Sequence, residues 1–330
     1  MTLSDQKVAL VTGANGGVGL ALCERMLAEN PKLKLILACR NLARAIAAKK
    51  VLTTGRPAAS VDIVLMDVSS VASVYRAARE ISQAYDRLDY LFLNAGFMKV
   101  THVDWQSFFG RLFTAQCVEM LATGKGLLVQ DGQKTPEGLQ AVFATNLFGH
   151  YVLLREVDAL LRRGARVVWT SSVNASSAEF DIADVQCARG AEPYASSKHA
   201  VDLTSVALSE RWRDRGVHSH VTCPGLVLTN LTYGILPRWF WTLIVPLLYL
   251  MRVFLPSNTI DPYHGSEAHV WVANQRAESL DPALKYCSRV SVLGNAYTDA
   301  LKLDVTLDEG EHLLDQLSQL ELDMRQKFKK

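Results

Sequence analysis

Two side chains four positions apart, Tyr194 and Lys198, have the types and spacing for acid–base chemistry. Residues four apart lie on one face of a helix, and residues 194–215 have the pattern of a helix. A tyrosine hydroxyl in water has a pKa of about 10, which is too high for efficient proton transfer at neutral pH. A neighbouring ammonium favours the phenolate and lowers that pKa. The pair therefore predicts a tyrosine that gives a proton to a carbonyl oxygen while a hydride reaches the carbon.

Two further polar groups are candidates for the same site. A strand predicted over residues 166–170 is followed by Ser171 and Ser172. A serine hydroxyl at that point can bind the substrate oxygen and stabilise the transition state, and we favour Ser172. Asn146 lies inside a helix predicted over residues 135–163, where asparagine is unfavourable unless its side chain or the freed backbone has a task. We expect it to bind a water that links the lysine to solvent.

A glycine-rich turn near the start of the chain has the pattern of a phosphate-binding site. It follows a strand predicted over residues 8–11, and it leads into a helix predicted over residues 17–30. Glycines there permit a tight turn and let the backbone approach a pyrophosphate, which then meets the positive end of the helix. The residues expected to hold a dinucleotide in this turn are Thr12, Gly13, Asn15, Gly17, Val18 and Gly19.

Three strand ends carry the other expected dinucleotide contacts. Arg40 follows the second strand, where an acidic residue would bind the ribose hydroxyl of NAD and an arginine instead pairs with the 2′-phosphate of NADP. Asp67 follows the third strand and would bind the adenine amino group. Asn94, Ala95 and Gly96 form a small-residue turn after the fourth strand, where the backbone must pass the cofactor. The sequence therefore predicts NADPH and NADP+ as the cofactor pair.

The elements that position these residues alternate between short apolar runs and amphipathic stretches. The predicted strands lack polar alternation, which indicates burial on both faces in a parallel sheet covered by helices. Right-handed crossovers then give a Rossmann-type, doubly wound α/β fold in a single domain. The other predicted strands are residues 33–38, 61–66, 88–93 and 217–223, and the other helices in this region are residues 41–52 and 71–85.

Two stretches interrupt the alternation of strands and helices. Residues 98–134 form an insertion, and residues 230–256 are very hydrophobic. We predict a cofactor-binding catalytic core over residues 1–229 that includes the insertion, and a membrane-associated lid over residues 230–256. Residues 257–330 would be a C-terminal extension that completes the fold. Within it, residues 308–327 carry leucines at helical spacing and predict an amphipathic helix that packs on the domain or on a partner.

The centre of the hydrophobic segment, residues 239–251, carries no charge and lies between Arg238 and Arg252. It contains Pro246 and is shorter than the roughly 20 apolar residues of a spanning helix. We prefer a lid that dips into one leaflet and admits a lipid substrate, and a single-pass anchor is the alternative. A third interpretation is a purely soluble apolar lid or a dimer surface, since exposed apolar patches also mark contacts with protein partners.

Composition argues against several other classes of protein. The 330 residues include 35 Lys plus Arg and 33 Asp plus Glu, and the resulting net charge of +2 gives no reason to expect nucleic acid as a partner. Six cysteines, at positions 23, 39, 117, 187, 223 and 287, form no CxxC pair. We therefore expect reduced thiols and no metal site. The sequence opens without a secretory apolar region, so we expect the fold to face the cytosol.

In their order along the chain, these motifs resemble the short-chain dehydrogenase/reductase family over residues 7 to about 230. The matching positions are the glycine turn, Asn94-Ala95-Gly96, Asn146, Ser172, Tyr194-x3-Lys198 and Pro224-Gly225. The resemblance implies that Asn146, Ser172, Tyr194 and Lys198 are catalytic. It also implies cofactor contacts, in which Tyr194 and Lys198 lie beside the nicotinamide ribose. Pro224 and Gly225 would line the nicotinamide, and Thr229 would hold its carboxamide.

A closer resemblance, to the steroid-ketone reductases of that family, extends to roughly residue 300. It rests on residues 20–23, 37–41, 192–198 and 229–237 and on the insertion. It implies reduction of sterol 3-ketones during removal of the C-4 methyl groups, and reduction of estrone to estradiol. It also implies an endoplasmic reticulum membrane with the catalytic domain facing the cytosol, and other C-4 demethylation enzymes as partners. The catalytic residues alone leave open a retinoid or another lipid carbonyl, or a cofactor-bound scaffold in a sterol-processing complex.

Overall fold

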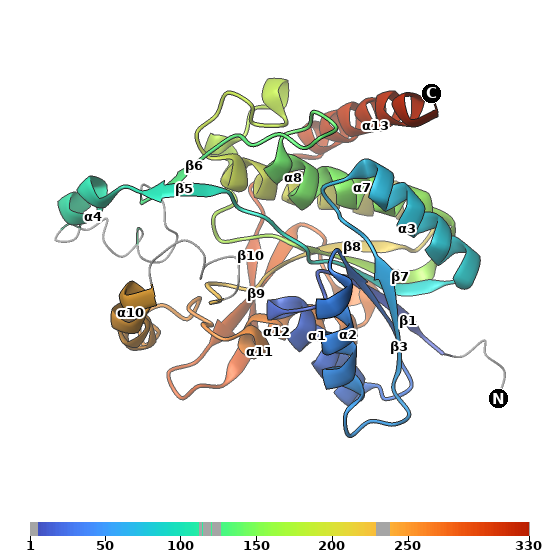
Figure 1. Ribbon diagram of the computed structural model, residues 1–330, viewed down its shortest axis with the longest axis horizontal. Coiled ribbons are helices and arrows are strands. Elements are labelled where there is room, and N and C mark those ends of the chain that lie inside the picture. Colours follow the sequence, from blue (N-terminus) through green and yellow to red (C-terminus); the bar gives the residue numbers. More distant parts are fainter. Residues whose placement is uncertain (1–5, 112–113, 115–119, 121–126, 229–237, 330) are drawn as a thin grey trace.

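The computed structural model describes residues 6–111, 114, 120, 127–228 and 238–329 (Figure 1). The strands of its central sheet are β1 (Val8–Thr12), β2 (Lys34–Cys39), β3 (Ser60–Leu65), β4 (Leu88–Leu93), β7 (Leu161–Thr170), β8 (His218–Cys223), β9 (Leu284–Val290) and β10 (Ala296–Lys302). Their order across the sheet is β10-β9-β8-β7-β4-β1-β2-β3. All neighbours pair in parallel except β9 and β10, which are antiparallel. The predicted Rossmann-type sheet is confirmed.

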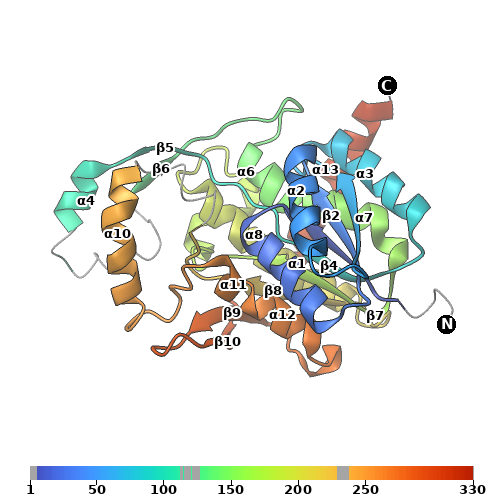
Figure 2. The same cartoon turned by 60° about the horizontal axis from the view of Figure 1, so that its bottom comes forward.

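Helices cover both faces of the sheet, as right-handed crossovers require. One face is covered by α1 (Gly17–Glu29), α2 (Leu42–Thr53) and α12 (Glu267–Asn274), and the other by α3 (Val71–Ala84), α7 (Gly149–Val157), α8 (Pro193–Arg211) and α13 (Leu307–Lys329) (Figures 1 and 2). Strand β1 is buried throughout, with Leu10 in the core of one face and Ala9 and Val11 in the core of the other. This two-sided burial explains why the strand is continuously apolar.

The prediction of a single helix over residues 135–163 is wrong at both ends. The helical stretch begins with α6 (Ala141–Phe143), passes through a π-helical segment (Ala144–Phe148) and continues as α7. After a 3-10 turn, β7 begins at Leu161 rather than at Arg166. Leu161 pairs with Leu88 of β4, and both side chains are buried. Sheet pairing therefore outweighs the helical propensity of the residues that follow Leu161.

Two pairs of strands were not predicted. In the insertion, β5 (Val100–Val103) pairs with β6 (Leu128–Gln130), and near the C-terminus β9 and β10 extend the sheet beyond β8. Strand β10 is mostly exposed and mixes charged with apolar residues, as a sheet edge does. Such a strand lacks the apolar run by which the central strands were identified.

The hydrophobic segment includes α10 (Arg238–Met251), which contains Pro246. In both views α10 lies at the same end of the molecule as β5, β6 and α4 (Trp105–Arg111) (Figures 1 and 2). Leu250 and, just after the helix, Phe254 are exposed, the latter to 81%. None of the helices in the described part of the chain is long and apolar enough to cross a bilayer.

The C-terminal helix α13 completes the core on the α8 face, because Leu313, Leu314 and Leu317 are fully buried there. We predict that Leu317→Ala lowers the free energy of unfolding by about 2–5 kcal/mol through lost burial and a residual cavity. Leu322→Ala, at a position of the same helix that is 49% exposed, should change it by about 0.5 kcal/mol or less. Urea denaturation of the full chain measures both. Equal effects of the two variants would contradict this role of α13.

Candidate active site

The turn between β1 and α1 has the backbone of an anion-binding loop. Gly13 and Gly17 have φ of 67° and 53°, in the left-handed region that favours glycine. A Cβ on Gly19 would lie 2.5 Å from the carbonyl oxygen of Gly13 and 2.6 Å from Asn94 Nδ2, so α1 can pack against the strand ends only with glycine there. Within the described residues, no side chain caps the N-terminus of α1. Its first N–H groups can therefore receive a phosphate.

The remaining residues of this turn occupy distinct places. Asn15 is partly exposed within the turn, and Val18 is buried in the first turn of α1. Thr12 is fully buried at the end of β1, which places its hydroxyl beneath the loop rather than at its surface. Five of the six predicted residues thus lie in the turn or in the first turn of α1. The sixth, Thr12, is buried beneath the turn and supports it from below.

The Thr12 hydroxyl joins the ends of β1 and β4. Its oxygen accepts hydrogen bonds from the backbone N–H groups of Asn94 at 2.8 Å and Ala95 at 2.9 Å. Asn94 Nδ2 also donates to the Thr12 carbonyl at 2.9 Å. Two acceptors are available for the hydroxyl proton of Thr12. His150 Nε2 is 3.0 Å from Thr12 Oγ1 and is nearer than the Phe92 carbonyl oxygen at 3.4 Å. The hydroxyl therefore fixes the small-residue turn beside the glycine loop.

His150 is a site residue that the sequence reasoning did not identify. It is buried on α7, and its Nδ1 faces the carbonyl oxygen of Asn146 at 3.4 Å. Burial, together with the charge of Lys198, lowers the pKa of His150 to about 3, so the ring is neutral at physiological pH. In the sequence, only its position four residues after Asn146 could have indicated that His150 belongs to the site. A neutral ring that accepts from Thr12 on Nε2 donates from Nδ1, which ties the π-helical segment to the glycine loop.

Two predicted cofactor contacts lie at neighbouring strand ends. Arg40 immediately follows β2, is exposed, and forms no ion pair with other described residues. Asp67 follows β3, and its Oδ1 accepts from the backbone N–H of Ser69 at 2.9 Å and from the Ser69 hydroxyl at 2.7 Å. Arg40 thus presents a cation at the rim of the site, while Asp67 is held in a tight turn that leads into α3.

The third group of predicted cofactor residues follows β8. Pro224 accepts a hydrogen bond on its carbonyl from Thr259 Oγ1 at 2.8 Å, and Gly225 has φ of 75°. Leu226 donates to the carbonyl of Ser257 at 2.8 Å, so residues 257–259 brace this turn. Thr229 lies outside the described residues.

Helix α8 presents Tyr194 and Lys198 on one face, with Lys198 Nζ 5.7 Å from the centre of the Tyr194 ring. The helix starts at Pro193, a favourable first residue because proline lacks the N–H that a helix start leaves unpaired. Lys198 is 3% exposed, and its ammonium donates to the Thr170 carbonyl at the end of β7 at 2.7 Å. Burial lowers the pKa of Lys198 to about 8, and Asp202 on the next turn opposes that effect.

The expectation that the ammonium lowers the pKa of Tyr194 is wrong for this structure. Burial raises the pKa of Tyr194 to about 12, and a hydrogen bond with Ser172 opposes the rise. The cost of moving a phenolate out of water therefore exceeds the stabilisation that its neighbours provide. Tyr194 holds its proton at neutral pH.

The two candidate serines differ in their surroundings. Ser171 is buried, and its hydroxyl donates to the Lys198 carbonyl at 3.5 Å. Ser172 is partly exposed and lies close enough to Tyr194 to lower its pKa. Geometry therefore favours Ser172 over Ser171 as the hydroxyl beside the tyrosine.

Asn146 lies in the π-helical segment, a distortion that often occurs at functional sites. Its Nδ2 donates to the Phe97 carbonyl and to Ser197 Oγ, each at 3.0 Å, and its Oδ1 accepts from the Phe97 N–H at 2.7 Å. A Cβ on Gly96 would lie 3.7 Å from Asn146 Oδ1 and 3.8 Å from Lys198 Nζ. The asparagine thus joins the turn after β4 to the helix that carries Lys198.

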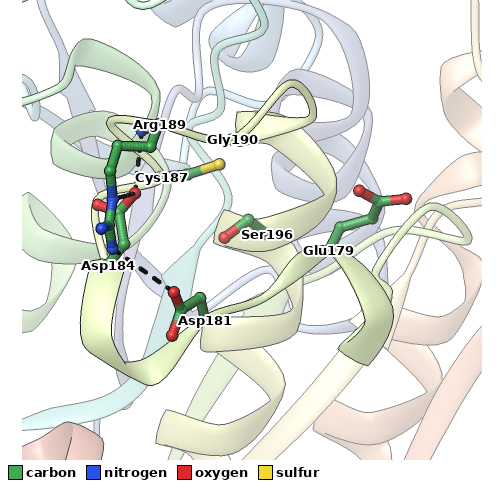
Figure 3. A pocket seen from close by; sticks show the side chains of 7 residues that line it. All are labelled: Glu179, Asp181, Asp184, Cys187, Arg189, Gly190 and Ser196. Atoms are coloured by element: carbon green, nitrogen blue, oxygen red, sulfur yellow. Dashed lines mark hydrogen bonds and ion pairs between the residues drawn. The ribbon is translucent and has the colours of Figure 1, made fainter.

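A separate cavity of about 410 Å³ lies over the N-terminal half of α8 and is drawn in Figure 3. Arg189 forms ion pairs there with Asp181 at 3.6 Å and Asp184 at 3.4 Å, and Glu179 adds a third carboxylate, so the lining stays acidic. Tyr194 and Lys198 do not line this cavity. In the described part of the chain, no cluster of three His, Cys, Asp or Glu residues could hold a metal ion.

Comparison with known proteins defines the class. The family model of the short chain dehydrogenases matches residues 7–237, and the chain belongs to this family. The chain is 47% identical over 323 residues to the rat protein named 3-keto-steroid reductase/17-beta-hydroxysteroid dehydrogenase 7, with 97% of each chain covered. The human protein of that name is 45% identical, with 97% of this chain and 95% of the human chain covered.

More distant relatives extend the same comparison. A 3-keto-steroid reductase of Schizosaccharomyces pombe is 28% identical over 349 residues, with 99% of each chain covered. An uncharacterised protein of Mycobacterium paratuberculosis has the same fold, with a TM-score of 0.65, 19% identity and 97% of each chain covered. A metagenomic blue fluorescent protein solved with NADPH has a TM-score of 0.61 at 18% identity, covering 85% of this chain and 95% of that one.

We predict that Thr12→Val destabilises the protein by about 1–3 kcal/mol, because it leaves the N–H groups of Asn94 and Ala95 buried without an acceptor. Thr12→Ser keeps the hydroxyl and should retain most of the wild-type stability. Denaturant unfolding of the three proteins measures the difference. If valine were tolerated as well as serine, the Thr12 hydroxyl would not be the support of this turn.

Proposed function

We propose that this chain is an NADPH-dependent reductase of sterol 3-ketones that also reduces the 17-ketone of estrone. The observation that carries the proposal is the convergence of Tyr194, Ser172 and Lys198 beside the glycine loop, at the carboxyl edge of the sheet. The substrate class is supported by the two mammalian relatives, whose names specify 3-keto-steroid and 17β-hydroxysteroid chemistry, at 45–47% identity over nearly the whole chain.

The loop residues fit a nicotinamide dinucleotide, which when bound supplies the hydride. The uncapped N-terminus of α1 receives the diphosphate, and Arg40 pairs with the 2′-phosphate that distinguishes NADPH from NADH. Asp67 binds the adenine amino group, and the turn from Asn94 to Gly96 forms the floor of the site. Lys198 holds the nicotinamide ribose. Pro224, Gly225 and Thr229 hold the nicotinamide ring and its carboxamide.

Tyr194 acts as the proton donor to the ketone oxygen. Burial raises its pKa to about 12, so the phenol is protonated at neutral pH, which is the form that a reduction needs. Ser172 lies beside Tyr194 and binds the same ketone oxygen, which stabilises the negative charge that develops there. Asn146 holds the Phe97 backbone and Ser197, and so keeps the cofactor turn and the catalytic helix in register.

The apolar end of the molecule supports the proposal of membrane association. Leu250 of α10, Phe254 three residues after that helix and Phe109 of α4 are exposed. The helices α10 and α4 lie at the same end of the molecule (Figures 1 and 2). We assign residues 230–256 as a lid that inserts into one leaflet of the endoplasmic reticulum membrane from the cytosolic side. The lid admits a sterol to the core formed by residues 1–229 with its insertion at 98–134. Residues 257–330 complete the sheet, and other C-4 demethylation enzymes act on the same membrane.

The catalytic assignment predicts that Tyr194→Phe lowers kcat for a 3-keto sterol by about 10²–10⁴-fold, because the general acid is lost. The affinity for NADPH, measured by fluorescence titration, should stay within about twofold, because the lost hydroxyl contributes to chemistry more than to binding. Tyr297→Phe, at an exposed position of β10, is the matched control and should retain full turnover. Estrone is assayed beside the sterol. Full activity of Tyr194→Phe would contradict the mechanism.

The lid assignment predicts that the double variant Leu250→Asp, Phe254→Asp no longer floats with phosphatidylcholine vesicles, because charged groups oppose insertion of the apolar surface. Val51→Asp places the same charge at an exposed apolar position of α2 and should leave flotation unchanged. Circular dichroism confirms that each variant is folded. Undiminished flotation of the double variant would remove this segment as the membrane contact.

A further inference from the structure

A buried ion pair lies next to the proposed catalytic residues. Lys285 Nζ is 2.7 Å from Asp202 Oδ2, and the two side chains are only 12% and 4% exposed. Asp202 lies on α8 four positions after Lys198 and eight after Tyr194, so the three share one face of the helix. Lys285 comes from β9, beyond the residues that the family model matches.

Lys285 also contacts the main chain of the proposed catalytic serine. Its ammonium donates to the Ser172 carbonyl at 3.1 Å while it is paired with Asp202. Strand β9 brings it there because β9 pairs in parallel with β8, with Lys285 opposite Val221. One ammonium thus joins β9, the end of β7 and the catalytic helix.

The charged groups around Lys198 come from three elements, α8, β8 and β9. Two buried histidines also face it, His150 on α7 and His269 on α12, and burial lowers the pKa of each to about 3, so both are neutral at physiological pH. Burial lowers the pKa of Lys198, and Lys285 adds to that effect by repulsion. Asp202 on α8 and Cys223 on β8 oppose it. Cys287 on β9 faces Cys223, and the hydrogen bond between the thiols lowers the pKa of Cys223. Two buried ammonium groups therefore face one carboxylate, whose Oδ1 has no hydrogen-bond partner among the described residues.

We propose that Asp202 and Lys285 are positioning residues of the reductase: Lys285 holds the Ser172 main chain against Tyr194, and Asp202 holds Lys285 and balances the charge of Lys198. The inference rests on the proposed function, since Ser172, Tyr194 and Lys198 are assigned there. It predicts that removal of Asp202 and removal of Lys285 shift the pKa of Lys198 in opposite directions. Loss of an ion pair that only stabilises the fold would not produce such opposite shifts.

The test compares Asp202→Asn, Lys285→Met and the conservative Lys285→Arg as full-length proteins. Losing Lys285 removes a repulsion and should move the alkaline limb of kcat/KM to higher pH, while losing Asp202 should move it to lower pH, each by about one unit. The pH dependence of NADPH affinity, followed by fluorescence without any substrate, should shift in the same two directions. Lys285→Arg keeps the charge and should restore the wild-type limb.

The kcat of Lys285→Met should also fall by about tenfold or more, because Ser172 loses the group that holds its carbonyl in place. Lys34→Met removes a second ion pair of 2.6 Å, with Asp62 on β3, and should change neither kcat nor the limb. Cys223→Ala, carried through the series, should leave the opposite shifts intact, which separates them from titration of the thiols.

The outcomes separate the two proposals. Suppose that the wild type reduces the ketone but the alkaline limbs of the variants shift in the same direction or do not shift. This result would overturn the positioning role and would not affect the proposed reductase function. A folded wild type that binds NADPH but reduces no ketone would overturn the proposed function. The NADPH affinity profiles would then still decide whether Asp202 and Lys285 act on Lys198 in opposite directions.

Discussion

The site depends on keeping one ammonium charged inside the protein. Lys198 is almost fully buried, and burial of a cation is costly unless polar partners replace water. The Thr170 carbonyl supplies one partner and the Asp202 carboxylate supplies compensating charge, so the pKa of Lys198 falls only to about 8 and the group stays protonated at neutral pH. Each partner comes from a different element: β7 ends at the ammonium, and α8 presents Asp202 one turn beyond it. The parallel sheet is the means by which these elements meet.

The sequence predicted what local pattern encodes. The glycine turn, the four-residue spacing of Tyr194 and Lys198 and the apolar central strands each follow from conformational or burial rules that act over a few residues. The π-helical segment around Asn146 was not predicted, because one altered turn of helical hydrogen bonds does not change the hydrophobic periodicity of the sequence. Strand β10 was not predicted, because an edge strand tolerates charged residues and therefore lacks a continuous apolar run. The Asp202–Lys285 pair joins distant parts of the chain, and only the tertiary structure brings them together.

The insertion and the catalytic helix are mechanically linked. Gln130 of β6 accepts a hydrogen bond on Oε1 from the Tyr194 backbone N–H at 3.1 Å, and its Nε2 donates to Glu192 at 2.6 Å. Glu192 itself makes no side-chain cap of α8, so the insertion provides the acceptor that the start of this helix needs. The same insertion lies at the end of the molecule where α10 exposes its apolar residues. The surface that would receive a sterol and the tyrosine that would protonate it are therefore joined by one hairpin.

The most direct test of the account is transfer of a labelled hydride. Purified protein in detergent is incubated with a 3-keto sterol and NADPH that carries deuterium at the transferable position of the nicotinamide, and the product is analysed by mass spectrometry. The account predicts a 3-hydroxysterol with one deuterium on C-3 from the wild type and only trace product from Tyr194→Phe. A folded, NADPH-binding wild type that leaves the ketone unlabelled and unreduced would contradict it.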